Sequence, residues 1–394
     1  MNLATPAAGC AALFLASTLF SHTVALRLLL ILGGGVLVVA QVWRARRRGA
    51  GGAIELLPPL LVPIGLWAGW AILSLAWSID PSLTSKELRN EIGYALAAYW
   101  LCWAAAQAPA APRVVIAVFG LGGLAVCVTA LVESLVPRLS ALQLHGGPGA
   151  FSSTLLILYP CTLGWAWFAA ARRWNAAWIA LPLLLLPLYV VAGYLTLNRI
   201  LWIALAAQTA VMALLVLSRP GAAARSRRLV ALAAVILIAG AGTALTKVQS
   251  TRAIVDPGDP RPALWQTVLR KIEERPLAGS GFGRGMYRHE LRKETGNPFL
   301  WHSHSLYLDT ALQLGWTGLA LLLAVFGGTL ALAWRLARSA DEATFACGLV
   351  LLPLVAGTLV RNLTDVLWVR QSALLYWGVV GVLLAWGMKA GRAR

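Results

Sequence analysis

Two histidines stand close together in the segment His302-Ser303-His304-Ser305, and their chemistry could be metal binding or acid–base catalysis. If a helix begins near Ser303, the two rings point in different directions, and Asp309 is the one carboxylate nearby, so a shared metal site has weak support. A single neutral imidazole can instead accept a proton from a hydroxyl group. Nearby arginines favour this role, because positive charge lowers the pKa of a histidine and keeps it unprotonated.

Basic side chains crowd the segment that ends at these histidines. Residues 247–305 carry ten Lys/Arg against six Asp/Glu, a net charge of +4. Arg261, Arg284 and Arg288 flank prolines and glycines, where backbone can approach a ligand closely, and they predict an anionic ligand. A solvated amphipathic face explains the other basic side chains well enough; these are Arg270, Lys271, Arg275, Arg292 and Lys293.

Two further charged residues stand at the ends of apolar runs. Arg199 joins two such runs, so it is either a side chain that snorkels to the membrane surface or a fixed cation for phosphate oxygens. Asp365 follows Arg361 by four residues, so the two could pair on one helix face. Alternatively, Asp365 could orient a histidine or a substrate hydroxyl.

The elements that position these residues are predicted to be membrane-spanning helices. Of the 394 residues, 59% are hydrophobic and only 12% are charged, with a mean hydropathy of +0.73. A soluble domain has about 25% charged residues. The sequence therefore predicts an all-α polytopic membrane protein. All five cysteines lie in apolar segments without metal-ligand spacing, so neither a disulfide framework nor a zinc site is predicted.

Apolar runs near the length of about 20 residues that crosses a bilayer predict about twelve spans in one helical domain, residues 1–394. Sixteen of the 33 Lys/Arg lie in short segments beside apolar spans, and every second connection is one of these basic segments, as is typical of cytoplasmic loops. The net charge of +18 therefore does not indicate a protein that binds nucleic acid. Both termini are then cytoplasmic, and residues 247–305 form a long outward loop between the ninth and tenth spans. The predicted spans are 6–22, 25–43, 57–77, 92–108, 114–136, 151–171, 175–196, 199–218, 229–246, 306–333, 343–362 and 371–388.

Two short amphipathic helices are predicted in the outward loop. The first opens at residues 259–262, the second covers residues 286–293, and both are expected to lie over the mouth of the bundle. The glycines of residues 279–285 follow no strand and lie outside the membrane, so they do not predict a nucleotide-binding loop. The apolar stripe of the first helix consists of Leu264, Trp265, Val268, Leu269 and Ile272.

Several motifs resemble those of the O-antigen ligase family. His304-Ser305, then Gly315 after nine residues and Gly318 after two more, resembles the family pattern H-[N/S/Q]-x9-G-x-x-G, although many relatives have Asn in place of Ser305. The resemblance extends over most of the chain from about residue 60. It also includes Arg199 after the seventh span, the series Arg261, Trp265, Pro276, Leu277, Gly279 and Gly281, and the late motif Asn362-x-Thr364-Asp365.

The resemblance implies a GT-C-like fold and a glycosyltransferase of the bacterial inner membrane whose active site faces the periplasm. It implies transfer of a polysaccharide from undecaprenyl pyrophosphate to a sugar hydroxyl of lipid A–core, with inversion and without a metal or other cofactor. His304 would be the general base. The implied substrate contacts are Arg199, Arg261 and Arg284 on the leaving pyrophosphate, together with Arg288, His302 and Asp365.

Three other functions remain possible on the sequence. An O-antigen polymerase or a protein-O-oligosaccharyltransferase shares the fold and the need for arginines and a base. A single dominant loop and the histidine motif favour a ligase over a polymerase. An anion transporter is a function of another class, and it would require charged residues near the bilayer midplane, where the predicted spans have almost none.

Overall fold

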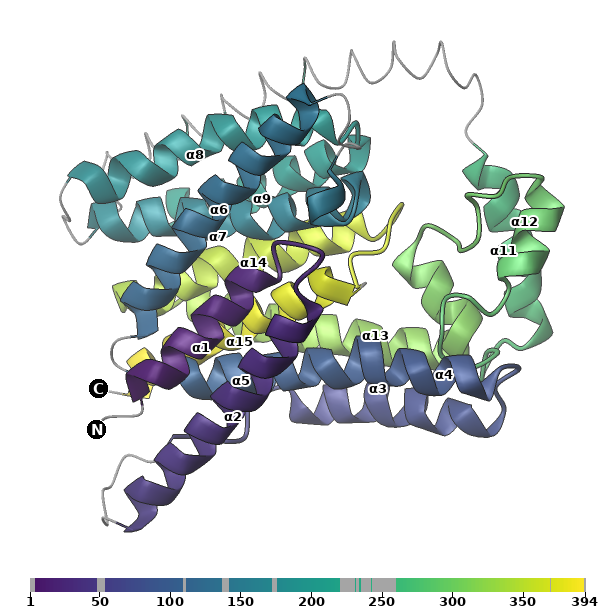
Figure 1. Ribbon diagram of the computed structural model, residues 1–394, viewed down its shortest axis with the longest axis horizontal. Coiled ribbons are helices and arrows are strands. Elements are labelled where there is room, and N and C mark those ends of the chain that lie inside the picture. Colours follow the sequence, from purple (N-terminus) through teal and green to yellow (C-terminus); the bar gives the residue numbers. More distant parts are fainter. Residues whose placement is uncertain are drawn as a thin grey trace.

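The computed structural model describes residues 4–47, 54–108, 111–136, 142–171, 176–219, 260–368 and 370–392, together with residues 231, 234 and 242. All regular elements within these ranges are helices, which confirms the all-α prediction (Figure 1). The α-helices are α1 (Ala4–Ser17), α2 (Val24–Arg47), α3 (Leu61–Leu73), α4 (Pro81–Glu87), α5 (Tyr94–Ala106), α6 (Ala111–Leu135), α7 (Pro148–Ala171), α8 (Ala176–Leu195), α9 (Arg199–Leu217), α11 (Arg261–Glu274), α12 (Arg288–Thr295), α13 (Leu306–Ala337), α14 (Glu342–Arg361) and α15 (Arg370–Arg392).

The chain is a membrane protein with multiple spans. Within the described ranges, seven helices are long and apolar enough to cross a bilayer, namely α2, α6, α8, α9, α13, α14 and α15. The shorter or partly described helices α1, α3, α5 and α7 coincide with four more of the predicted spans. The predicted ninth span, residues 229–246, lies outside the described residues apart from three isolated positions. The total of twelve therefore stays a prediction.

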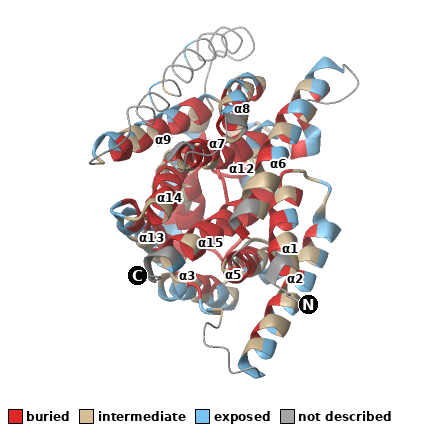
Figure 2. Cartoon of the chain, turned by 90° about the vertical axis from the view of Figure 1, so that its left-hand side faces the viewer, coloured by how far each residue is buried: buried red, intermediate tan, exposed pale blue. Residues whose placement is uncertain are grey.

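The bundle is built around α15. In the most apolar 18-residue stretch of α15, 89% of the residues are buried, whereas in that of α2 only 17% are buried. α15 packs against α5 and α14, and α14 in turn packs against α7, α9 and α13. Figure 2 shows buried residues gathered on these central helices and exposed residues on the outer sides of α2 and α8. Helix α2 is thus at the periphery, where an apolar surface suits lipid.

The two helices of the long loop lie at one end of the bundle. The start of α1 and the end of α15 lie at the opposite end (Figure 1). This arrangement agrees with a loop on one side of the membrane and both termini on the other, although which side is which stays a prediction.

α11 and α12 share a small core of their own with the first turns of α13. Three residues of the predicted stripe, Leu264, Val268 and Ile272, are fully buried against Leu291 of α12 and Leu312 of α13. Their spacing of four residues places them on one helix face. The apolar side of α11 is therefore turned toward protein, so packing accounts for the stripe.

α13 is broken at Gly315, whose φ of 68° and ψ of −176° are essentially restricted to glycine. A break interrupts the backbone ladder of a helix and leaves its carbonyl groups in need of donors. Residues 276–283 lie against the break, and Ser280, Gly281 and Trp70 of α3 supply donors, while Pro276 accepts from the N–H that follows the break. Ser280 N–H donates to Leu312 C=O (3.2 Å), Gly281 N–H to Gln313 C=O (2.9 Å), Trp70 Nε1–H to Leu314 C=O (3.0 Å), and Trp316 N–H to Pro276 C=O (2.7 Å).

The glycines of this segment are required by contact between two parts of the chain. A Cβ on Gly315 would collide with the carbonyl of Leu277, and a Cβ on Gly279 would collide with the carbonyl of Gln313. We expected these glycines to let backbone approach a ligand. Gly279 instead lets residues 276–283 approach the backbone of α13, and Gly281 lets them approach Ser78.

Residues 78–91, between the third and fourth predicted spans, are largely helical. They contain α4 and most of a π-helical turn, Leu88–Gly93, that continues into α5. Asp80 caps α4, because its Oδ1 accepts a hydrogen bond from the N–H of Leu83 (3.0 Å). A continuous helical path thus carries Glu91 into the bundle beneath the loop.

Replacement of Gly315 by alanine is expected to destabilise the fold. The left-handed backbone alone costs about 1–3 kcal/mol for a residue with a Cβ, and the collision with Leu277 adds to it. Gly327→Ala, in the same helix with nothing within 4 Å of the added Cβ, is the control and should be neutral or slightly stabilising. Thermal unfolding in detergent measures both variants, and equal midpoints would contradict this account of the break.

Candidate active site

The segment 302–305 forms a tight turn directly before α13. Ser303 Oγ donates to the carbonyl of Ser305 (2.8 Å) and accepts from the Ser305 N–H (3.1 Å). Trp265 of α11 donates its indole N–H to the carbonyl of Ser303 (2.8 Å). From the other side, Leu306 N–H donates to the carbonyl of Asn362 at the end of α14 (3.0 Å). The turn is therefore held between α11, α13 and α14.

His304 has a left-handed backbone, with a φ of 53°. Such a conformation is uncommon for a non-glycine residue and persists only where surrounding contacts impose it. Its Nε2 is shielded from solvent and forms no hydrogen bond within the described parts of the chain. Burial lowers the pKa of His304 to about 4, and the charge of His302 acts in the same direction. The imidazole is therefore neutral near pH 7, as a base must be.

The two histidine rings pack against each other, with centroids 4.0 Å apart and planes tilted by 31°. The rings would point in different directions if a helix began near Ser303, but the helix begins at Leu306. His302 is buried, and its Nδ1 lies 3.3 Å from Oδ2 of Asp309. No group of three His, Cys, Asp or Glu side chains in the described ranges is arranged to hold a metal ion.

Asp365 and Arg361 form an ion pair at the end of α14, with Nη2 and Oδ2 2.8 Å apart. Arg361 is fully buried and also donates to Ser153 Oγ (3.1 Å) and to the carbonyl of Gly149 (2.9 Å). Burial works to raise the pKa of Asp365, but Arg361, the N–H of Val366 and the histidines hold it below its ordinary value. The charge of Asp365 raises the pKa of His304, so the carboxylate lies within electrostatic reach of the ring.

Arg261 lies within electrostatic reach of His304, and Arg284 lies near Trp301, with its guanidinium carbon 5.9 Å from the ring centroid. Arg261 begins α11, one turn before Trp265, and its charge lowers the pKa of His304. Arg284 is almost buried and pairs with Glu91, with Nη2 and Oε1 2.7 Å apart. Burial raises the pKa of Glu91 to about 7, against the opposing effect of Arg284. Arg284 is thus fixed by protein contacts, whereas the sequence predicted only a ligand contact.

Arg288 is exposed and stacks over Trp301, with its guanidinium carbon 4.7 Å from the ring centroid. The edge of Trp301 in turn packs against His302, with centroids 4.5 Å apart. Because a guanidinium stacked on a ring keeps its in-plane N–H donors, Arg288 can still bind an anion.

Arg199 lies at the same end of the bundle, on a different helix. It begins α9, its side chain is exposed, and it forms no ion pair with another described residue. The preceding Asn198 donates to Ser152 Oγ (3.2 Å), next to the Ser153 that binds Arg361. The structure thus connects the start of α9 to the end of α14 through α7, and describes no direct contact between Arg199 and the histidines.

Two acidic residues of the site had no assigned role in the sequence analysis. Asp309 was considered only as a metal ligand, although one turn into α13 it faces the histidine turn. Glu91 had no signal at all, because its partner Arg284 lies 193 residues away. Both line a cavity of about 40 Å³ beneath the histidines, together with Arg284 and Gln313.

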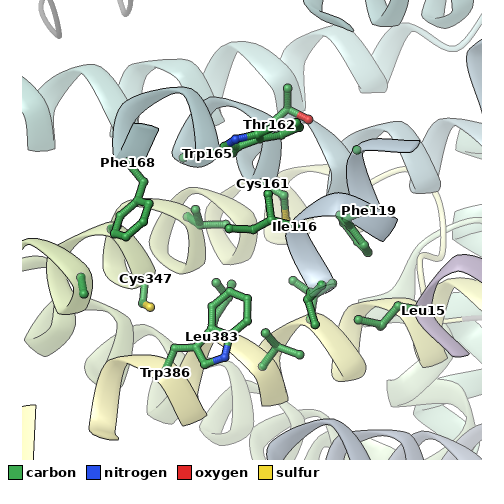
Figure 3. A pocket seen from close by; sticks show the side chains of 18 residues that line it. Leu15, Ile116, Phe119, Cys161, Thr162, Trp165, Phe168, Cys347, Leu383 and Trp386 are labelled. Atoms are coloured by element: carbon green, nitrogen blue, oxygen red, sulfur yellow. The ribbon is translucent and has the colours of Figure 1, made fainter. Parts of the chain in front are cut away.

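A larger cavity, of about 160 Å³, lies elsewhere in the bundle and is almost wholly apolar. Cys161 and Trp165 of α7 face Leu383 and Trp386 of α15 across it (Figure 3). It also reaches Cys347 near the start of α14, roughly 20 Å along the helix axis from Arg361. Its walls contain no ionisable side chain apart from thiols, so it is not the candidate active site.

Two comparisons with known proteins bear on this geometry. Residues 177–323 match the family described as O-Antigen ligase. A protein of Pseudomonas aeruginosa named O-antigen ligase is 27% identical over 290 residues, which cover 71% of this chain and 66% of that protein. The aligned region is therefore just under two thirds of the relative's own length.

The matched region contains Arg199, Arg261, Arg284 and both histidines of the turn. The comparisons and the motif spacing thus point to one family. The resemblance to the O-antigen ligase family is confirmed, and residues 177–323 are the part of the chain that matches the family.

Proposed function

We propose that this protein is an O-antigen ligase, a glycosyltransferase that moves a polysaccharide from undecaprenyl pyrophosphate to a sugar hydroxyl of lipid A–core. The observation that carries the proposal is the neutral His304, whose Nε2 is uncommitted, among arginines at the loop end of the bundle. A neutral base and clustered cations are the two requirements of glycosyl transfer from a pyrophosphate donor.

In the proposed reaction the acceptor hydroxyl gives its proton to Nε2 of His304, and its oxygen attacks the anomeric carbon. The bond between that carbon and the pyrophosphate oxygen breaks, and the electron pair leaves with undecaprenyl pyrophosphate. A single displacement inverts the anomeric centre. Arg199, Arg261, Arg284 and Arg288 stabilise the growing negative charge, so that no metal or other cofactor is needed.

Donor binding would also make His304 a stronger base. A pKa of about 4 keeps the ring neutral, but a base is most effective when its pKa lies near the working pH. The pyrophosphate would bring negative charge close to Arg261, whose own charge lowers the pKa of His304. Opposite charge nearby favours the protonated imidazole, so the pKa rises when the donor is in place.

The chain itself would form a single membrane domain, with residues 247–305 as a loop inserted between two spans. We place this loop and the histidine turn on the periplasmic face of the inner membrane, with both termini in the cytoplasm. Membrane lipids surround the spans, and lipid-linked donor and acceptor reach the site from the outer leaflet. Asp365 and His302 complete the polar surroundings of His304.

Loss of the imidazole should abolish transfer. His304→Ala is expected to lower the ligation rate by about 10²–10⁴-fold in an assay with purified lipid-linked donor and lipid A–core, the contribution typical of a general base. Exposed His22 in the turn between α1 and α2 offers the control, His22→Ala. Wild-type turnover by His304→Ala would show that His304 is not the general base. Loss of wild-type activity in excess EDTA would show that the reaction requires a metal ion.

The exposed arginine over Trp301 tests the proposed anion site. Arg288→Gln should weaken transfer by about tenfold or more, since a charge-assisted contact to a phosphate is lost. Arg270→Gln is the matched control, because Arg270 is an equally exposed loop arginine that pairs only with Glu294 in the described structure. The rate at several donor concentrations measures both variants, and equal losses in the two would argue against a specific site at Arg288.

The alternative functions leave different products in the cell. Without a ligase, long undecaprenyl-linked polymer accumulates and the core is left bare; without a polymerase, single repeat units still reach the core. A protein-O-oligosaccharyltransferase leaves the core unaffected and removes glycan from protein, and an anion transporter changes none of these products. A deletion strain analysed for lipid-linked polymer and for capped core is expected to show the first pattern.

A further inference from the structure

A buried carboxylate–histidine pair lies directly behind His304. Asp309, on the first turn of α13, is 2% exposed, and His302 is 7% exposed. Oδ2 of Asp309 is 3.3 Å from Nδ1 of His302. Oδ1 accepts a hydrogen bond from the backbone N–H of Ser303 (2.9 Å). One carboxylate therefore contacts both the first side chain and the backbone of the turn.

The position of the hydrogen on His302 follows from these contacts. Nδ1 lies 3.1 Å from the backbone nitrogen of His304 and 3.3 Å from Oδ2 of Asp309. It can either accept a hydrogen bond from the His304 N–H or donate one to Asp309, but not both. Oδ2 of Asp309 has no other donor in the described structure. A buried carboxylate oxygen without a donor costs more than one weakly bonded backbone N–H. Nδ1 of His302 is therefore assigned the hydrogen, which it donates to Asp309.

The oriented ring of His302 forms one wall for the ring of His304. The centroids of the two rings are 4.0 Å apart, and the ring of Trp301 also packs against His302, with centroids 4.5 Å apart. The strained backbone of His304 needs such support, because a left-handed histidine in a free turn would relax. Asp309 thus constrains His304 twice, through the ring of His302 and through the N–H of Ser303.

We propose that Asp309 and His302 are positioning residues for His304, which hold its imidazole in the orientation that accepts the acceptor proton. The inference rests on the proposed function, in which His304 is the base. Neither residue needs to touch the substrate. The inference also gives His302 a role in holding His304, whereas the sequence predicted that His302 contacts the substrate.

Charged groups on every element around His304 set its affinity for a proton. Asp309 on α13 and Asp365 after α14 raise its pKa, whereas His302 in the same turn and Arg261 on α11 lower it. Burial outweighs all of them and brings the pKa to about 4. Removal of Asp309 and removal of His302 should therefore move the pKa of His304 in opposite directions. A purely structural defect would not produce this sign pattern.

The test uses Asp309→Asn and His302→Gln in the purified full-length protein. Both variants should lower kcat by about tenfold or more, because the base is no longer held in place, and both should leave KM for donor and acceptor unchanged. In kcat/KM for the donor, which reports the enzyme before the donor binds, the wild type should retain about half of its pH 7 value at pH 4, since half of the base is neutral at its pKa. Asp309→Asn should retain a larger share at pH 4, and His302→Gln a smaller one.

The control is Glu294→Gln, which removes a carboxylate from an exposed ion pair on α12 and should match the wild type in rate and pH response. If Asp309→Asn does not fold, as judged by size-exclusion chromatography, the rate and pH response of His302→Gln decide the question. A folded variant with wild-type kcat and wild-type pH response overturns the positioning role. If such a variant is found and His304→Ala is inactive, only this inference is refuted. If His304→Ala is fully active, the proposed function itself is refuted.

Discussion

The break in α13 at Gly315 is the constraint on which the rest of the site depends. A helix in a membrane normally satisfies its own backbone groups, and irregular backbone is tolerated there only when other protein groups replace the lost partners. Residues 276–283 act as those partners, with hydrogen bonds to the carbonyls of Leu312 and Gln313. The loop is therefore joined to the membrane bundle by backbone contacts that are difficult to shift independently of it.

This junction fixes the place of the charged groups that the loop and α13 bring to the histidine turn. On one side of residues 276–283, α11 reaches back and binds Ser303 through Trp265. On the other side, Arg284 enters the bundle to meet Glu91, and Arg288 stacks on Trp301 beside the histidines. The unbroken first turns of α13 carry Asp309 beneath the turn. The described part of the loop, residues 260–305, thus behaves as a fixed cover that brings Arg261, Arg284 and Arg288 toward the histidine turn.

The sequence predicted the parts of this arrangement that depend on local chemistry. Hydropathy located the spans that coincide with described helices, since each is a run of apolar side chains, and the four-residue spacing of Leu264, Val268 and Ile272 located α11. The pairing of Arg284 with Glu91 could not be predicted, because contacts between distant segments leave no pattern in one sequence. The glycines of residues 279–285 were recognised as sites of close backbone approach, but a single sequence does not show whether a ligand or another chain segment approaches.

The site combines a base that is too weak in isolation with cations that an anionic donor would partly neutralise. Burial and the charge of His302 hold the pKa of His304 far below neutrality, while Asp365 and Asp309 oppose them. A base that stayed protonated would be useless, and one that stayed so weak would drive proton transfer poorly. In the proposed reaction the donor pyrophosphate raises the pKa of His304, since its negative charge favours the imidazolium. Proton transfer then becomes favourable only when the donor is bound, which would couple activation of the acceptor hydroxyl to the presence of the sugar that it attacks.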